Sequence, residues 1–175
     1  MSTRERYPCE RVGLDFFATA PIARSTAVEV AATPERVFAL FLDADAWVRW
    51  APPITAVHWT SGLPLEVGST RDVHMWGGLV GHEEFLTYDH GRRMAFRFNE
   101  ASRDDVRAFA EDYLVTSLGG GRCRVEWTMA LDTGRSSRPR PAHRRRSRGR
   151  GVLHAQALRP PRGVRLHARL RRRRP

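Results

Sequence analysis

The sequence has no lysine, only two cysteines and no long apolar run. All 30 basic residues are arginines, a usage typical of GC-rich coding DNA and therefore of a GC-rich bacterial source. Cys9 and Cys123 are too few and too far apart for a disulfide framework or a cysteine metal site. No run of about 18 apolar residues occurs, and acidic residues interrupt the N-terminal segment, so we expect neither a membrane span nor a secretory signal. These absences favour a soluble, cytoplasmic protein.

Acidic residues are also missing from the end of the chain. Residues 135–175 contain 16 arginines and no aspartate or glutamate, whereas the first 134 residues hold the other 14 arginines and all 19 acidic residues. The net charge of +11 therefore comes from this tail, and the part before it carries −5. At 175 residues, the length suits one ordinary domain. We expect a lead-in over residues 1–24, a folded domain over 25–134 and an Arg/Pro-rich tail over 135–175.

Residues 25–50 organise the expected domain. Apolar and polar residues alternate over residues 26–31, as in a half-buried strand. Thr33 is a favourable N-cap and Pro34 suits the first helical position, so a helix begins there. The polar residues 43–45 separate this helix from a second short one that ends near Trp50.

Alternating apolar residues predict six further strands. They cover residues 54–60, 70–76, 79–88, 92–98, 106–118 and 122–131. Glycines at 77–78 and 119–121 supply the positive φ angles of tight turns between strands. The triplet lacks the helix and lysine of a phosphate-binding loop. Because short turns join most of the strands, the sequence predicts an antiparallel sheet with one apolar face that needs a cover.

This order of elements resembles the START-like helix-grip superfamily (SRPBCC), on its polyketide cyclase/dehydrase branch. The resemblance covers about residues 25–131 and is carried by ERVFALFLDADAWVRWAPP, HEEFLTYDHGRRMAFRF and LGGGRCRVEWTMAL, with no catalytic signature. It implies an α+β fold in which a curved seven-stranded antiparallel sheet, with two short helices after the first strand, grips a long C-terminal helix. It also implies an apolar cavity between sheet and helices for a lipid, polyketide or similar molecule.

The tail departs from the superfamily pattern. Where the resemblance implies the long helix, residues 135–175 have no sustained apolar face and contain Pro139, Pro141, Pro160 and Pro161, which break helices. We therefore expect that helix to be absent or replaced, and the tail to be disordered or the product of a shifted reading frame. The alternative is a native basic tail that binds nucleic acid, because its arginines would contact phosphates.

The large apolar residues of the expected strands are the candidate ligand-binding residues, with ordinary core packing as the alternative. They are Trp59, Met75, Phe85, Met94, Phe96, Phe98, Phe109, Tyr113, Trp127 and Met129. Three polar residues, His74, Glu84 and Glu111, are possible members of the cavity or else face solvent. A buried carboxyl group among them would have a raised pKa and could act as an acid or base.

The motifs indicate no catalytic residue, no metal and no cofactor. His74, His82, Glu83 and Glu84 straddle a hairpin without the spacing of known metal sites, and no nucleophile elbow occurs. The sequence therefore predicts a protein that binds a hydrophobic small molecule as a carrier, a sensor or a cyclase/dehydratase-like protein. Whether it is an enzyme stays open, and nucleic-acid association through the tail is the alternative function.

Overall fold

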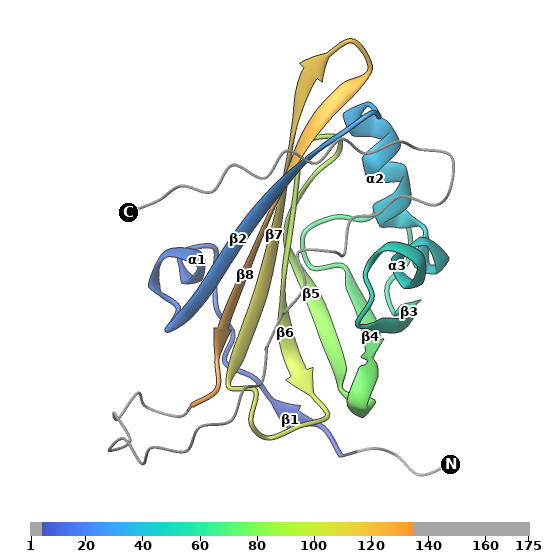
Figure 1. The fold of residues 1–175 in the computed structure, drawn as a ribbon. Helices are drawn as coiled ribbons and strands as arrows, with labels where there is room; N and C mark the ends of the chain where they lie inside the picture. The colour runs from blue at the N-terminus through green and yellow to red at the C-terminus, as the bar shows by residue number, and fades with distance from the viewer. Residues whose placement is uncertain (1–4, 135–175) are drawn as a thin grey trace, which may run out of the picture.

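The computed structural model describes residues 5–134 and consists of one curved antiparallel sheet with short helices on both faces (Figure 1). The strands lie in the order β2-β8-β7-β6-β5-β4-β3. Their bounds are β2 (Ile22–Val30), β3 (Ile54–Trp59), β4 (Thr70–Met75), β5 (Val80–Asp89), β6 (Arg93–Ala101), β7 (Ala108–Gly119) and β8 (Arg122–Asp132). A two-residue strand, β1 (Tyr7–Pro8), also pairs with β6. The predicted seven-stranded helix-grip sheet is confirmed, with β1 as an addition.

Two short helices follow β2, as predicted, and lie over the concave face of the sheet (Figure 1). Helix α2 (Pro34–Leu42) begins where the Thr33 hydroxyl accepts a hydrogen bond from the backbone N–H of Arg36. Helix α3 (Ala44–Trp50) begins at Asp43, whose carboxylate accepts from two backbone N–H groups of the first turn. Asp43 is therefore both the C-cap of α2 and the N-cap of α3.

Indole groups satisfy the last carbonyls of α2, which have no partner within a helix. The Nε1–H of Trp47 donates to the carbonyl oxygen of Phe41 at 2.9 Å. The Nε1–H of Trp59 on β3 donates to the carbonyl oxygen of Leu42 at 3.2 Å. These two bonds join the end of α2 to α3 and to the sheet.

The main core lies between these helices and the concave face. Phe38, Phe41 and Trp47 of the helices are at most 2% exposed and pack against inward side chains of β4 to β8. The alternation of each strand sends every second residue to this face, as Val73, Phe85 and Phe96 show by their complete burial. The space between helices and sheet is thus occupied by aromatic and branched side chains.

The concave face is less covered along β8 and β2. The inward residues Trp127, Met129 and Leu131 of β8 are half-buried, although they are large and apolar. Ile22, opposite Leu131 on β2, is 36% exposed. The long C-terminal helix that the resemblance implies falls in residues 135–175, outside the described residues. The Trp127–Met129–Leu131 row is called here the open strip.

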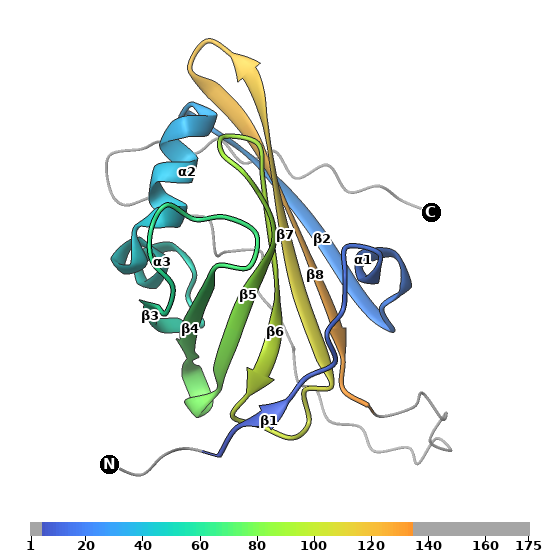
Figure 2. The same cartoon turned by 180° about the vertical axis from the view of Figure 1, so that it is seen from behind.

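The N-terminal segment packs on the convex face, seen from behind in Figure 2. Phe16 of α1 (Phe16–Thr19) packs against Ala108, Ala110 and Ala130, three small residues that face away from the main core. The backbone N–H of Cys9 donates to the carbonyl oxygen of Asn99, which extends the contact made by β1. The lead-in therefore covers the back of the sheet, and the first long strand already begins at Ile22.

Glycine is required where the end of an aromatic ring approaches the backbone of a strand. The connection between β4 and β5 is one turn of 3-10 helix, Trp76–Gly78, in which Gly77 and Gly78 have φ angles of 74° and 79°. Just after this turn, a Cβ atom added at Gly81 would lie 2.3 Å from the ring of Phe98. Phe98 is itself 1% exposed and packs against Phe109, with the rings tilted by 44° at a centroid distance of 4.5 Å, so it has no room to move away.

We predict that Gly81→Ala destabilises the protein by about 1–3 kcal/mol, because an overpacked core must shift its side chains and backbone. Gly62→Ala is the matched control, since a Cβ atom there would meet no atom within 4 Å. Chemical denaturation of both variants measures the difference. Equal midpoints for the two variants would contradict this account of Gly81.

Candidate ligand-binding site

A buried ion pair lies at the centre of the concave face. Arg71 of β4 and Glu83 of β5 are register partners, and both point inward with Val73 and Phe85 of the same strands. The Nε–H of Arg71 donates to Oε2 of Glu83 at 2.5 Å, and the two side chains are 0% and 4% exposed. Burial of two charges is costly unless they are paired, so this pair constrains how the strands and helices pack around it.

Four aromatic rings surround the Arg71 guanidinium. Its Cζ atom lies 4.2 Å from the ring centroid of Trp47 and 4.5 Å from that of Phe96. The rings of Trp59 and Phe85 follow at 5.4 and 5.5 Å. A desolvated guanidinium gains about 2 kcal/mol or more from each favourable contact of this kind, which offsets part of its desolvation cost.

Several buried donors near this pair have no acceptor. In the described part of the chain, the buried side-chain polar atoms without a hydrogen-bond partner are Nη1 and Nη2 of Arg71, Nε1 of Trp50 and Nε1 of Trp127. All four belong to the concave interior and all four are N–H donors. Buried donors are normally satisfied in native proteins, so these atoms mark a place where an acceptor is expected.

A carboxyl and a phenol lie beside the ion pair on β7. Glu111 is opposite Phe96 of β6 and Met129 of β8, and the hydroxyl of Tyr113 donates to Oε2 of Glu111 at 3.1 Å. Burial, together with the charge of Glu83, raises the pKa of Glu111 to about 8, against the opposing effects of Tyr113, Arg71 and the nearby Trp127 indole. Burial and the neighbouring Glu111 also raise the pKa of Tyr113 well above its usual value.

The interior is therefore close to electrically neutral at neutral pH. The charges of Arg71 and Glu83 offset each other, although burial still raises the pKa of Glu83 above its usual value. Glu111, with its pKa near 8, is mostly protonated below that pH and keeps a proton that it can donate. This arrangement can hold a polar group of a ligand and can supply one exchangeable proton.

The predicted lining residues lie on the concave face. Trp59, Phe85, Met94, Phe96, Tyr113 and Trp127 belong to the main core or pack against it. Phe98 and Phe109 form a smaller cluster near the β4–β5 turn, and Met75 contacts both groups. Met129 is opposite Glu111 and lies in the open strip. Their role in ligand binding stays a prediction.

The three predicted polar residues do not all lie on the same face of the sheet. Glu111 points inward, as described above. Glu84 lies on the convex face, where its carboxylate accepts from Arg97 and Asn99 at 3.0 and 2.6 Å. His74 also points outward, with its ring 5.3 Å from that of His58. For these two side chains the structure favours the solvent-facing alternative, because the alternation of Arg71, Val73 and Phe85 places their neighbours on the outer face of the sheet.

Sequence reasoning missed Arg71, Glu83, Trp47 and Trp50. The signal for the first two was available, because Arg71 alternates with Val73 and Met75 on one predicted strand, and Glu83 with Phe85 on the next. The row of apolar partners indicates an inward position even when one member is charged. Trp47 and Trp50 were identified only as parts of the second helix.

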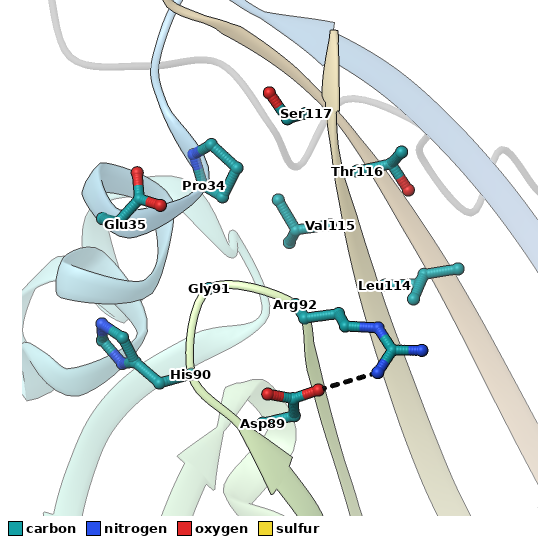
Figure 3. Close-up of a pocket in the computed structure, with 10 residues that line it drawn as sticks. All are labelled: Pro34, Glu35, Asp89, His90, Gly91, Arg92, Leu114, Val115, Thr116 and Ser117. Atoms are coloured by element: carbon teal, nitrogen blue, oxygen red, sulfur yellow. Dashed lines mark hydrogen bonds and ion pairs between the residues drawn. The ribbon is translucent and has the colours of Figure 1, made fainter. Parts of the chain in front are cut away.

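A surface groove with a volume of about 460 Å³ lies beside the N-terminus of α2 (Figure 3). It is bounded by Pro34 and Glu35, by the β5–β6 turn around Gly91, and by residues 114–117 of β7. Asp89 and Arg92 in this turn form an ion pair at 3.1 Å. Val115, on its floor, is two residues from Tyr113, so the groove adjoins one end of the concave interior.

Neither a metal site nor a membrane-spanning helix is found in residues 5–134. No group of three His, Cys, Asp or Glu side chains is placed to hold a metal ion there. No helix in that part is long and apolar enough to cross a membrane. Nucleic-acid binding through the arginine-rich tail concerns residues 135–175, outside the described residues, and stays a prediction.

The curved sheet, with its helices against a concave face that contains few polar groups, defines a START-like helix-grip protein. The chain belongs to the family described as polyketide cyclase/dehydrase and lipid transport, whose model matches residues 22–159. Uncharacterized proteins of Mycobacterium tuberculosis and Mycobacterium bovis are 53% identical to it over 133 residues, which is 76% of this chain and 79% of each relative.

Solved structures agree on the fold. A hypothetical protein from Helicobacter pylori has a TM-score of 0.58 at 19% identity, over 75% of this chain and 80% of that protein. A START superfamily protein from Mycobacterium smegmatis has a TM-score of 0.53 at 16% identity, over 69% and 81% of the two chains. The Zhui aromatase/cyclase from Streptomyces has a TM-score of 0.53 at 19% identity, over 64% and 68%. At these identities the likeness concerns the fold.

We predict that stability falls as pH rises through the range in which Glu111 ionises. The pKa of Glu111 is higher in the folded protein than in the unfolded chain, so the folded state favours its protonated form. This stabilisation is fully present below about pH 4, the pKa of a glutamate in the unfolded chain, and is lost as the pH rises toward 8, the pKa of Glu111 in the folded protein. Glu111→Gln should therefore gain on the order of 2 kcal/mol over the wild type between pH 5 and 9.

Thermal unfolding at a series of pH values measures this difference. Glu126→Gln on β8, whose side chain is 43% exposed beside Arg124, is the matched control and should follow the wild type at each pH. A Glu111→Gln profile parallel to that of the wild type would show that Glu111 does not titrate near pH 8.

Proposed function

We propose that the protein binds a hydrophobic small molecule against the concave face of its sheet, as a carrier, a sensor or a cyclase/dehydratase-like protein. The observation that carries this proposal is the open strip, in which three large apolar residues remain half-buried next to the buried polar groups of the interior. Small-molecule sites combine such apolar walls with a few polar groups that orient the ligand.

The family supports the same class of ligand. Its description joins polyketide cyclases and dehydrases with lipid transport, and both activities handle molecules with extended apolar parts. The likeness to an aromatase/cyclase and to a START superfamily protein is consistent with this class but concerns the fold alone.

Binding is favoured over catalysis because both interior carboxyl groups already have hydrogen-bond partners within the protein. Glu83 is held by Arg71, and Glu111 is hydrogen-bonded to Tyr113. A cyclase or dehydratase activity would use Glu111, because its pKa of about 8 suits a group that gives and takes a proton near neutral pH. The rest of the site would act by holding a reactive chain in one orientation.

We predict that Thr26→Phe weakens the binding of dodecan-1-ol by about tenfold, which corresponds to about 1.4 kcal/mol. Thr26 is half-buried on β2, opposite Trp127 of the open strip, so a phenyl ring there would occupy the space proposed for the ligand. Ala27→Phe is the matched control, because Ala27 is exposed and points to the other face. Titration calorimetry and the fluorescence of the interior tryptophans measure the binding.

Native mass spectrometry of the purified full chain provides an independent measurement and should detect a co-purified lipophile. The proposal fails if neither dodecan-1-ol, dodecanoic acid nor an aromatic lipophile such as 2-naphthol binds the wild-type protein. It also fails if Thr26→Phe and Ala27→Phe have the same effect, since the ligand would then lie elsewhere.

A further inference from the structure

The donors of the concave interior indicate the chemistry of the ligand's polar end. We propose that Arg71 binds the carboxylate of an amphipathic carboxylic acid through Nη1 and Nη2, while the apolar part of the acid lies along the open strip. This inference rests on the proposed function and adds the ligand class and the residue that selects it.

One edge of the buried Arg71 guanidinium has no acceptor among the described residues. Its Nε–H is used by Glu83, whereas Nη1 and Nη2 have no acceptor among the described residues. The rings of Trp47 and Phe96 contact the guanidinium through their faces, at 4.2 and 4.5 Å, and an aromatic face provides no conventional acceptor atom. Two N–H groups on one planar edge match the two oxygens of a carboxylate in a bidentate pair.

A further unpartnered donor favours the same kind of ligand group. Of the four interior indoles, those of Trp47 and Trp59 donate to carbonyl oxygens at the end of α2, and that of Trp127 lies against Glu111, where it opposes the rise in pKa that burial causes. The indole of Trp50 has no partner among the described residues. The Trp50 ring lies 4.4 Å from that of Trp47, which itself covers Arg71. A site with only free donors is complemented by a group that only accepts, and an ionised carboxylate is such a group.

Charge balance makes this binding depend on Glu111. The titratable and charged groups nearest the site are Arg71 of β4, Glu83 of β5, and Glu111 and Tyr113 of β7. The Tyr88 phenol of β5 and the Cys123 thiol of β8 belong to the same core, and burial raises the pKa of both. The other inward positions of β6, β8, α2 and α3 are apolar or aromatic, and Arg24 of β2 is an exposed residue opposite Met129. Because Glu83 already offsets Arg71, an added carboxylate is tolerated only while Glu111 keeps its proton.

The pKa of Glu111, raised to about 8 by its burial and by Glu83, keeps this proton in place at neutral pH. Above that pH a second negative charge would lie beside the bound carboxylate and repel it. The affinity for an acid should therefore fall between pH 7 and 9, whereas the affinity for an uncharged ligand of the same length should stay constant.

The test compares dodecanoic acid with dodecan-1-ol, which differ in the polar end alone, by titration of the full chain at pH 6.5. We expect the wild type to bind the acid at least about tenfold more tightly than the alcohol. Arg71→Met should remove this preference, so that acid and alcohol bind with equal affinity. Arg93→Met is the matched control, because Arg93 pairs with Asp112 on the convex face of the same sheet and should retain the preference.

A second variant covers the case in which Arg71→Met does not fold, since that change leaves Glu83 buried without its partner. The double variant Arg71→Met/Glu83→Gln removes both charges and should likewise bind acid and alcohol equally. Equal binding of the two ligands by the wild type, or a preference that survives the loss of Arg71, overturns this inference and leaves the proposed function standing. Binding of neither ligand overturns this inference, and it overturns the proposed function as well if 2-naphthol also fails to bind.

Discussion

The structure depends on the ion pair between Arg71 and Glu83 more than on any other single contact. Two opposite charges on neighbouring strands are held in an apolar interior, and the aromatic rings of α3, β3, β5 and β6 are arranged around the guanidinium. Removal of either partner would leave the other charge buried and unpaired, so the pair restricts which side chains those elements can carry. The packing of the helices on the sheet follows from this restriction.

The polar interior and the half-exposed apolar strip are complementary parts of one surface. Arg71, Glu83 and Tyr113 are buried beside the helices, and Glu111 lies at the margin of this buried region, opposite Met129. The large side chains of β8 continue from there along the strand next to β2, which forms the sheet edge. A molecule with one polar end and one apolar end could place the first against the polar interior and the second along the open strip. A purely apolar molecule would use the strip alone.

The sequence predicted the fold well because its signals are local. Thr33 and Pro34 mark the start of α2, and the alternation in residues 92–98 identifies a strand that the structure contains as β6. The polar site was harder to predict, because Arg71 and Glu83 are charged residues in apolar rows and only their pairing across two strands makes burial tolerable. The faces of Glu84 and His74 could not be decided from the sequence, because both faces of their strands carry apolar and polar residues, so parity depends on register and not on composition.

The junction between α2 and α3 makes the two helices one mechanical unit. Asp43 caps the second helix directly at the end of the first, and the indole of Trp47 is hydrogen-bonded to the backbone of Phe41, whose ring it also stacks against at 5.7 Å. Little freedom remains between the two axes. A ligand that enters beneath them would therefore have to displace both helices together, about the two chain segments that join β2 to α2 and α3 to β3.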